Sequence, residues 1–386
     1  MENIPRRLKI KLPAKRSAFL WGARKTGKST YLKEHFPKSL KIDFLRTDTF
    51  FEYTKRPALL RERLLDQKAL ASKAPVILDE VQKVPQILDE IQSLIEDFGL
   101  SFILCGSSAR KLKRGQANLL GGRAWRYEMF PFVSAELKEL NLMQALNRGL
   151  IPEHYLDSNY HKSQQAYIQD YLKEEVFDEG LTRNIPAFSR FFDALGFSHG
   201  EMINCSNIAR DCGVDAKTVR EYFQILEDTM LGRMVSPFKK RQNRQVISKA
   251  PKFYLFDVGI AGRLCQRRIS DAKGELFGKA FEHFIFMELA AYRSYSDLDF
   301  PIEYWRTKTG LEVDFVLGRG EVAVEVKGTS RVDPNDLRSV KAFIEEYSPK
   351  KTYVVCNEPE ARLVGKIRLV PWRIFLKELW QGKVLS

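Results

Sequence analysis

The spacing of apolar and polar residues divides the chain into regions with different predicted structure. In the first third, short apolar runs such as residues 18–21, "VILD" and "FILC" alternate with helix-compatible segments. Each run has the character of a strand buried on both faces of a parallel sheet. The segment from about 14 to 135 is therefore predicted to be a parallel α/β domain, with its site at the carboxyl ends of the strands.

The middle of the chain has helical periodicity from Ala145 to about Phe197. One segment, "QAYIQDYLKEEVFDEG", places apolar residues at spacings that form a single buried face: Tyr167, Ile168, Tyr171, Leu172 and Val176.

The next segment has the outline of a helix-turn-helix and predicts a winged helix. Ser206 and Asp215 are the expected helix caps, and Gly213 is expected in the turn. The expected inward residues are Ile208, Ala209, Val219, Phe223 and Leu226.

Near the C-terminus, residues 312–327 read "EVDFVLGRGEVAVEVK", two valine-rich runs around a Gly-Arg-Gly turn. An amphipathic helix is predicted before them in "GKAFEHFIFMEL", with its inward residues being Phe281, Phe284, Ile285 and Leu289. Alternation along the second run places Glu325 and Lys327 on one strand face.

The amino-acid composition indicates what kind of partner the protein binds. The 386 residues contain 63 lysines and arginines against 49 acidic residues, a formal charge of +14. This balance favours a polyanionic partner such as nucleic acid, although a basic protein without such a partner stays an alternative. The five cysteines are scattered without a metal-site spacing, and no apolar run approaches the ~20 residues of a membrane span. We therefore expect a soluble, cytoplasmic protein with no membrane partner.

The strongest motif is "GARKTGKST", which fits the phosphate-binding pattern G-x-x-x-x-G-K-[ST] between a strand and a helix. Backbone N–H groups would surround the phosphates of ATP, with Lys28 reaching the β- and γ-phosphates and Ser29 ligating Mg²⁺. The predicted ATP-binding residues are Gly22, Ala23, Arg24, Lys25, Thr26, Gly27, Lys28, Ser29 and Thr30.

A second motif, "APVILDEVQ", ends an apolar run with two acids. Asp79 would hold Mg²⁺, and Glu80 would orient the attacking water, which is the main task in phosphoryl transfer. Alone, such an ending is also common where a helix begins.

Basic side chains suggest a DNA contact in the middle region. Lys217 and Arg220 would project from the second helix of the helix-turn-helix. A basic wing in "FKKRQNRQVISK" would add phosphate contacts through Lys239, Lys240, Arg241 and Arg244. Acidic residues on the same helix leave open a lid or a protein-docking module.

Taken together, these motifs resemble those of bacterial and archaeal AAA+-type ATPases, related to the STAND and archaeal ATPase clades, across nearly the whole chain. The motifs are "WGARKTGKST", "VILDEVQKVP", "LCGSSARKLKRG", "GGRAWRYEMFPF", "YIQDYLKEEV", "KAPKFYLFDVGIAG", "GKAFEHFIFMEL" and "YWRTKTGLEVDFVL" with "VAVEVKG". The resemblance implies an oligomeric ATPase with a winged helix and a C-terminal domain similar to PD-(D/E)XK nucleases. The expected division is residues 1–140, a P-loop parallel-sheet domain; 141–248, a helical lid and winged helix; and 249–386, an α/β restriction-endonuclease-like domain.

The resemblance also assigns roles near the γ-phosphate. In AAA+ enzymes a polar residue after the "FILC" strand contacts this phosphate or its water, which points to Ser107 or Ser108. Arg123 is expected to be an arginine finger that acts on a neighbouring subunit, or a γ-phosphate sensor. An arginine after two glycines is equally typical of a solvated turn.

In the nuclease-like domain, the resemblance implies that Asp314 and Glu325 bind metal while Lys327 supports the attacking water. Glu282 matches the helix glutamate of that motif. An even hairpin loop would pair Asp314 with Ala323, on the face of Glu325, whereas a three-residue loop would turn it away. The alternative is a silent site on a fold kept for DNA or protein binding.

The sequence thus predicts an ATP-binding, ATP-hydrolysing protein that processes duplex or branched DNA. Its nuclease-like domain would either cleave DNA or only bind it. The competing hypothesis is a nucleotide-dependent switch or scaffold whose C-terminal domain docks protein partners.

Overall fold

The computed structural model describes residues 4–13, 15–66, 74–108, 112, 120–172, 184–239 and 250–385. They form two compact units. The N-terminal unit consists of Leu8–Pro131 with Ile225–Leu231, and the C-terminal unit consists of Met1–Arg7, Phe132–Gln224 and Gly232–Ser386. Most of the predicted middle domain and the whole predicted C-terminal domain lie in the C-terminal unit, and the three-domain division stays a prediction.

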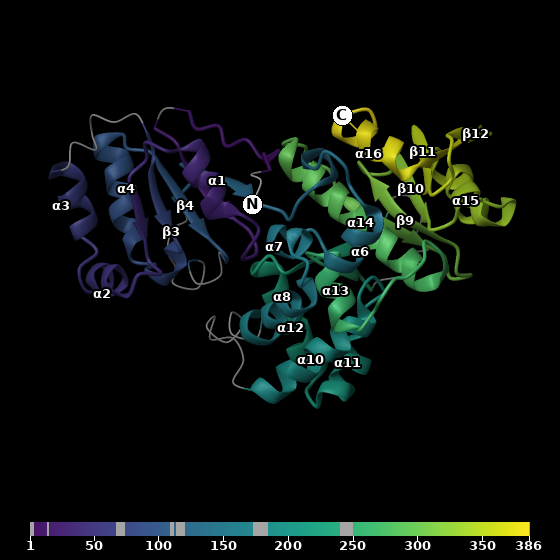
Figure 1. The fold of residues 1–386 in the computed structure, drawn as a ribbon, viewed down its shortest axis with the longest axis horizontal. Helices are drawn as coiled ribbons and strands as arrows, with labels where there is room; N and C mark the ends of the chain where they lie inside the picture. The colour runs from purple at the N-terminus through teal and green to yellow at the C-terminus, as the bar shows by residue number, and fades with distance from the viewer. Residues whose placement is uncertain are drawn as a thin grey trace. The chain divides into compact units, whose positions relative to one another are not determined.

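The N-terminal unit is a five-stranded parallel sheet with helices on both sides (Figure 1). Its strand order is β2-β3-β4-β1-β5, so β1 and β3 flank β4. The predicted parallel α/β architecture is confirmed for this unit. The strands are β1 (Ser17–Trp21), β2 (Lys41–Asp43), β3 (Val76–Asp79), β4 (Phe102–Gly106) and β5 (Ala124–Glu128), and the helices are α1 (Lys28–His35), α2 (Thr47–Lys55), α3 (Leu59–Asp66), η2 (Val81–Lys83) and α4 (Ile87–Phe98).

Helix α4 shows how the sequence determines the local structure of this unit. Its apolar residues recur at i, i+4 and i+8, as in Ile87, Ile91 and Ile95, and all three are buried. Gly99 ends the helix with φ of 66°, and its N–H donates to the carbonyl of Ile95. The helix therefore covers the sheet with one apolar face and stops where glycine permits the left-handed conformation.

The C-terminal unit combines a helical region with an eight-stranded mixed sheet of order β12-β13-β11-β10-β9-β8-β6-β7. Its strands are β6 (Gly232–Pro237), β7 (Lys252–Leu255), β8 (Ile302–Arg306), β9 (Glu312–Leu317), β10 (Val322–Lys327), β11 (Lys351–Cys356), β12 (Arg362–Val364) and β13 (Ile367–Pro371). Its helices are η3 (Ser134–Glu136), α6 (Leu142–Arg148), α7 (Pro152–Leu156), α8 (Tyr160–Ala166), η4 (Tyr167–Leu172), α10 (Ile185–Ser198), α11 (Cys205–Cys212), α12 (Ala216–Asp228), α13 (Val258–Leu264), α14 (Gly274–Tyr295), η5 (Pro334–Leu337), α15 (Arg338–Tyr347) and α16 (Trp372–Trp380).

One strand joins the helical region to the sheet. The first part of β6 pairs antiparallel with β7, while Ser236 and Pro237 at its end pair parallel with β8. Helix α14 packs against β10 of the same sheet (Figure 1). Because backbone hydrogen bonds cross the predicted boundary at residue 248, the two predicted domains share one sheet here.

The predicted helix-turn-helix segment contains α11 and α12. Gly213 ends α11 with φ of 67°, and Asp215 accepts hydrogen bonds from the N–H groups of Lys217 and Thr218, both at 2.8 Å. The cap of α11 is Asn204 rather than the predicted Ser206, because the Asn204 side chain accepts from the N–H groups of residues 206 and 207. An asparagine one residue before the helix satisfies these donors better than a serine already inside it. All five predicted inward residues are buried.

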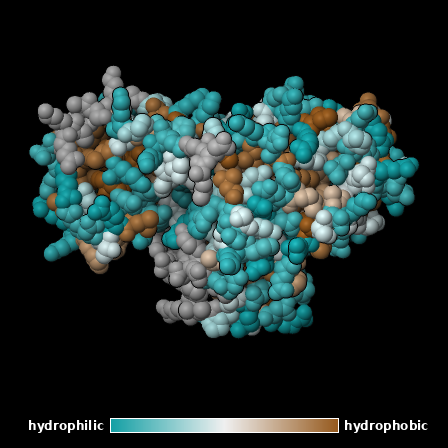
Figure 2. Space-filling model, in the orientation of Figure 1, coloured by the Kyte–Doolittle hydropathy of each residue, from teal (hydrophilic) through white to brown (hydrophobic). Residues whose placement is uncertain are grey.

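The visible face of the molecule is largely hydrophilic (Figure 2). Among the helices that the structure describes, none combines the length and apolar character needed to cross a membrane.

A buried carboxylate anchors the helical region. Asp257 caps α13 by accepting from the N–H groups of Gly259 and Ile260, and its other oxygen accepts from the N–H groups of Leu150 and Ile151. A Cβ on Gly149 would lie only 2.0 Å from this carboxylate. Burial raises the pKa of Asp257 to about 6 despite the four donors. Asp257 thus joins the α6–α7 connection to the start of α13.

We expect Asp257→Ala to lower the free energy of unfolding by at least about 3 kcal/mol, because several buried donors lose their acceptor together. Asp215→Ala, which removes an exposed cap, should cost only about 1 kcal/mol. Urea unfolding followed by circular dichroism measures both, and equal losses would contradict the anchoring role of Asp257.

Candidate nucleotide site and C-terminal carboxylate cluster

The predicted phosphate loop lies between β1 and α1, at the carboxyl edge of the N-terminal sheet. Lys28 is buried, and its ammonium donates to the carbonyls of Gly22 (2.6 Å) and Ala23 (3.1 Å). Thr26 Oγ1 also donates to the Ala23 carbonyl. A Cβ on Gly22 would lie 2.5 Å from the carbonyl oxygen of Met129, so this position requires glycine. The lysine is thus held inside the loop that it is expected to serve.

The predicted Mg²⁺ ligands meet beside this loop. Ser29 Oγ donates to Asp79 Oδ2 at 2.9 Å, and Lys41 Nζ lies 2.9 Å from the same oxygen. Burial alone would raise the pKa of Asp79, but the ion pair with Lys41 and the Ser29 hydrogen bond hold it below its usual value. Asp79 therefore stays ionised, the state in which a carboxylate binds metal.

The residues present fit a nucleotide with Mg²⁺. A hydroxyl and a carboxylate oxygen are ligands that Mg²⁺ prefers, and here the two side chains already touch. The first turn of α1 has no side-chain cap, which suits phosphate binding by its N–H groups. Lys41 was not among the predicted site residues, since nothing in its local sequence indicates that it reaches Asp79.

The side chain of Gln82 connects Glu80 and Ser107, two residues that were predicted to act near the γ-phosphate. Gln82 Nε2 donates to Glu80 Oε2 at 2.5 Å and to Ser107 Oγ at 3.1 Å, and all three side chains are buried. Glu80 itself has φ of 56°, a left-handed backbone that is uncommon outside glycine. The sequence analysis missed Gln82, although it lies only two residues after Glu80. Ser108 is also buried at this edge.

Arg123 lies at the amino ends of the strands, opposite the carboxyl ends where the phosphate loop lies. Its carbonyl accepts from the N–H of Ser17, where β1 and β5 begin, whereas the phosphate loop follows the other end of β1. Its guanidinium pairs with Glu96 of α4 at 2.7 Å, and both side chains are partly exposed. The prediction that Arg123 senses the γ-phosphate within its own chain is therefore wrong, because parallel β5 places it before the strand. Its role as a finger toward a neighbouring subunit stays a prediction.

In the C-terminal unit, the hairpin register decides whether the predicted nuclease residues meet. The loop between β9 and β10 has the even length that the site requires, but Ala323 pairs with Val316 rather than with Asp314. The antiparallel ladder ends at Phe315 and Val324. Continuing this register places Asp314 opposite Glu325.

Side-chain hydrogen bonds replace the ladder at this point. Asp314 Oδ2 accepts from the N–H of Val326 at 2.7 Å, and Glu325 Oε1 lies 2.7 Å from Lys327 Nζ. Burial raises the pKa of Asp314, and the nearby Glu325 raises it further. Burial also raises the pKa of Glu325 to about 7, although Lys327 opposes that shift. The structure thus brings Asp314, Glu325 and Lys327 together, while their catalytic roles stay predictions.

Glu282 is held by residues that the sequence analysis did not single out. Its Oε1 accepts a hydrogen bond from the Tyr254 hydroxyl and lies 3.3 Å from Lys252 Nζ. Both partners come from β7, outside the nuclease-like motif. The signal in the sequence was a lysine at the start of a strand whose other residues are Phe253, Tyr254 and Leu255.

The C-terminal cluster fits a metal ion only in part. Two carboxylates, Asp314 and Glu325, lie side by side, but the helix glutamate is engaged by Lys252 and Tyr254. Throughout the described ranges, no group of three or more His, Cys, Asp or Glu residues is arranged to hold a metal.

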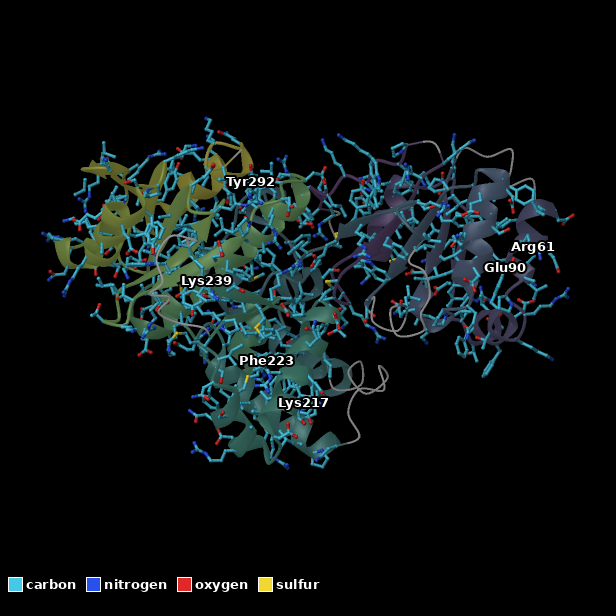
Figure 3. The ribbon with its side chains drawn as sticks, turned by 180° about the vertical axis from the view of Figure 1, so that it is seen from behind. Arg61, Glu90, Lys217, Phe223, Lys239 and Tyr292 are labelled. Atoms are coloured by element: carbon cyan, nitrogen blue, oxygen red, sulfur yellow. The ribbon has the colours of Figure 1, made fainter. Side chains whose placement is uncertain are left out.

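The predicted DNA-binding residues are only partly described. Lys217 and Arg220 are exposed on α12, whereas Phe223 of the same helix is buried. Figure 3 labels Lys217 and Phe223 on this helix. Lys239, after β6, is also exposed. Lys240, Arg241 and Arg244 lie outside the described residues. The three described cations are therefore accessible to a ligand.

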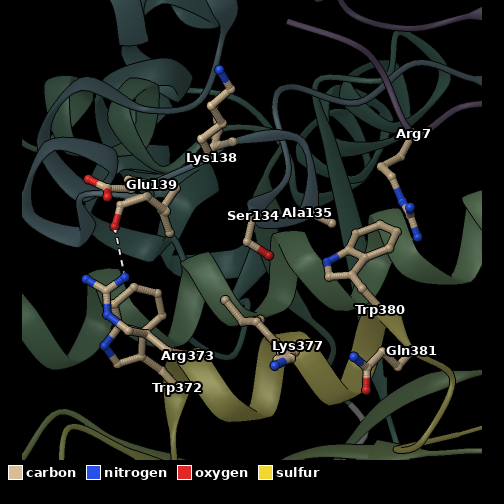
Figure 4. Close-up of a pocket in the computed structure, with 13 residues that line it drawn as sticks. Arg7, Ser134, Ala135, Lys138, Glu139, Trp372, Arg373, Lys377, Trp380 and Gln381 are labelled. Atoms are coloured by element: carbon tan, nitrogen blue, oxygen red, sulfur yellow. Dashed lines mark hydrogen bonds between the residues drawn. The ribbon is translucent and has the colours of Figure 1, made fainter.

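A cavity of about 420 Å³ lies elsewhere in the C-terminal unit, between α16 and the segment around Ser134 (Figure 4). Arg373 stacks on Trp372, with 4.3 Å from its guanidinium carbon to the ring centroid, and donates to the Leu140 carbonyl. None of the predicted site residues lines this cavity.

Comparison with protein families covers the chain in three segments. Residues 14–138 match an AAA domain family. The N-terminal unit is an AAA-type P-loop domain. Residues 139–271 match a domain of unknown function, DUF8612, and residues 277–375 match another, DUF4143.

Similar proteins are known from bacteria and archaea. An uncharacterized protein of Mycobacterium tuberculosis is 24% identical over 296 residues, which cover 72% of this chain and 64% of the relative. An uncharacterized protein of Methanocaldococcus jannaschii is 22% identical over 370 residues, covering 88% of this chain and 80% of the relative. The chain thus spans about 64% of the length of the mycobacterial relative.

Alignments with solved structures have low scores. A Walker-type ATPase of Pyrococcus abyssi aligns with a TM-score of 0.44 at 12% identity, over 64% of this chain and 90% of that one. The Aeropyrum pernix Orc1 protein, solved in complex with DNA, aligns with a TM-score of 0.29 at 12% identity, over 66% and 87%. Similarities this low do not specify a function.

We expect Lys28→Ala to weaken binding of Mg²⁺ and a fluorescent ATP analogue at least about tenfold, because the loop loses its phosphate-binding ammonium. Lys33→Ala removes an exposed lysine from the same helix and should leave the affinity unchanged. Equal affinities of Lys28→Ala and the native protein would show that nucleotide does not bind in this loop.

Proposed function

We propose that this protein hydrolyses ATP in its N-terminal unit and uses that cycle to process DNA. The observation that carries the proposal is the meeting of Lys28, Ser29 and Asp79 at the edge of the sheet where Glu80, Gln82 and Ser107 also lie. Strands β1, β3 and β4 supply these groups from their carboxyl ends, the usual location of a ligand in an open parallel sheet.

Each residue has a defined task in this proposal. Lys28 binds the phosphates, and Ser29 with Asp79 holds Mg²⁺, which neutralises charge on the transferred phosphoryl group. Glu80 accepts a hydrogen bond from the attacking water and orients it. Gln82 keeps the Glu80 carboxylate near Ser107, so it is a positioning residue.

The proposed DNA contact rests on charge and exposure. Lys217 and Arg220 are exposed on α12, which follows the turn at Gly213 and is the second helix of the helix-turn-helix segment. The chain carries a formal charge of +14. A helix in this position of a winged helix reads the major groove or the DNA backbone. We infer that α12 with the β6–β7 hairpin forms such a module.

The carboxylate cluster adds a nuclease-like site to this proposal. Asp314 and Glu325 would bind a divalent cation, and Lys327 would support the attacking water. Such a site acts on duplex or branched DNA, or retains DNA binding without cleavage. Self-association would give Arg123, on the opposite edge of the N-terminal sheet, a partner subunit to act on.

A second candidate is a nucleotide-dependent switch or scaffold that docks a protein partner. It is favoured by Glu221, Glu227 and Asp228 on α12, because acids on that helix repel DNA phosphates.

Gln82→Leu should lower the turnover number for ATP at least about tenfold while leaving the affinity for ATP unchanged, because Glu80 loses the donor that positions it. Gln92→Leu is the matched control, since Gln92 also donates to a glutamate, but through a solvent-exposed hydrogen bond to Glu96 on α4. A weakened affinity with unchanged turnover would mean that Gln82 supports binding rather than the position of Glu80.

The DNA hypothesis predicts ATP turnover that duplex or branched DNA stimulates and that Lys28→Ala abolishes. The double variant Lys217→Ala/Arg220→Ala should weaken DNA binding and reduce the slope of log affinity against log salt by about 2, because two phosphate contacts are lost. Lys341→Ala, an exposed lysine on α15, is the control.

The same reactions can be run on a gel to detect cleavage that depends on Mg²⁺ or Mn²⁺. Turnover that DNA does not change, together with no salt-dependent DNA binding, would favour the switch or scaffold.

A further inference from the structure

Lys252 approaches the carboxylate cluster from a strand outside the nuclease-like motif. Its side chain is 5% exposed, and its ammonium lies 2.5 Å from Glu312 Oε1 and 3.3 Å from Glu282 Oε1. The ring of Tyr304 lies beneath it, with 5.5 Å from the nitrogen to the ring centroid. The lysine is therefore fixed between two carboxylates rather than extended into solvent.

Both glutamates have a second partner. Glu312 Oε2 lies 2.6 Å from Arg306 Nη1, and Glu282 accepts from the Tyr254 hydroxyl. Each glutamate side chain is about one-fifth exposed. Loss of Lys252 would thus leave neither carboxylate without a donor.

The charges of the neighbouring residues explain why a cation is needed here. Asp314 and Glu325 are buried close to Glu282, and repulsion among carboxylates in a medium of low dielectric is costly. Lys327 compensates Glu325, while Lys252 compensates Glu282 and Glu312. A bound metal ion commonly supplies such compensation in a carboxylate site.

We propose that the cluster binds one hard divalent cation, at Asp314 and Glu325, and that the Lys252 ammonium fills a second cation position between Glu282 and Glu312. Lys252 keeps Glu282 out of the metal's coordination sphere and repels the bound ion. This inference rests on the metal site proposed above.

The origin of Lys252 gives this arrangement a structural consequence. β7 pairs with β6, which follows α12, whereas Asp314 and Glu325 lie on β9 and β10. Lys252 also belongs to the segment that matches one family, residues 139–271, while both carboxylates belong to the segment 277–375 that matches another. A side chain from the segment that contains the helix-turn-helix therefore limits metal binding at the carboxylates of β9 and β10.

The test is to measure Mn²⁺ binding to the full chain by electron paramagnetic resonance, in the absence of nucleotide. All variants carry Ser29→Ala, which removes a metal ligand of the phosphate loop. The background protein should bind one Mn²⁺ at the cluster. Lys252→Met should bind Mn²⁺ at least about tenfold more tightly or take up a second ion, because a positive charge near the divalent ion is removed.

Two further lysine variants separate charge from packing. Lys252→Arg keeps the positive charge and should retain the background affinity. Lys279→Met is the matched control, because Lys279 of α14 also lies between two glutamates, Glu201 at 3.1 Å and Glu275 at 3.0 Å, but its side chain is 48% exposed. Its removal should change nothing, since water screens the charge.

The results distinguish this inference from the metal site itself. Asp314→Asn should abolish Mn²⁺ binding at the cluster; if it does not, the proposed metal site is wrong, and this inference falls with it. If Asp314→Asn abolishes binding but Lys252→Met binds Mn²⁺ like the background protein or more weakly, only the role of Lys252 is overturned. Two Mn²⁺ ions bound in the presence of Lys252 would overturn it as well.

Discussion

A carboxylate inside a protein needs hydrogen-bond donors or cations around it, because its charge loses the stabilisation that water provides. This requirement is met at three buried acids of this chain. Asp79 is buried beside Ser29 and Lys41, Asp257 lies among four backbone N–H groups, and Glu325 lies beside Lys327. The fold brings Lys41 and Ser29 to Asp79, and Leu150 and Ile151 to Asp257, from segments far apart in the sequence, whereas Lys327 lies only two residues after Glu325.

The kind of partner separates structural carboxylates from those suited to chemistry. Backbone N–H groups around Asp257 cannot be exchanged without unfolding the local chain, so this residue serves as an anchor. The Lys41 cation beside Asp79 is partly exposed on a flexible stem and can make way for a metal ion, whereas Lys252 is buried between Glu282 and Glu312 and keeps its position. Glu288 lies between these cases: it accepts from Ser134 and Trp380, and burial raises its pKa to about 7.

Prediction from the sequence worked where the relevant geometry is local. The glycines and Lys28 of the phosphate loop, the turn at Gly213 and the cap at Asp215 involve residues a few positions apart, so their spacing already contains the geometry. The cap of α11 was assigned to Ser206 instead of Asn204 because helix ends shift easily by one or two residues. The prediction that Arg123 senses the γ-phosphate failed for a different reason. The distance of Arg123 from the phosphate loop depends on the direction in which β5 pairs with β1.

The sequence by itself determined the parallel N-terminal sheet, the phosphate loop and the identity of the acidic residues, because periodicity and motif spacing are properties of neighbouring residues. Tertiary structure alone decided that Asp314 lies opposite Glu325 and that Gln82 joins Glu80 to Ser107. It also decided that Lys41 reaches the buried Asp79 and that Lys252 reaches Glu282 and Glu312. A hairpin register depends on the length and conformation of its loop, and a long lysine side chain can reach any neighbour that packing brings near. Apart from the hydrogen bond between Gln82 and Glu80 and the hairpin pair of Asp314 and Glu325, these contacts join segments far apart in the chain, and no local pattern specifies them.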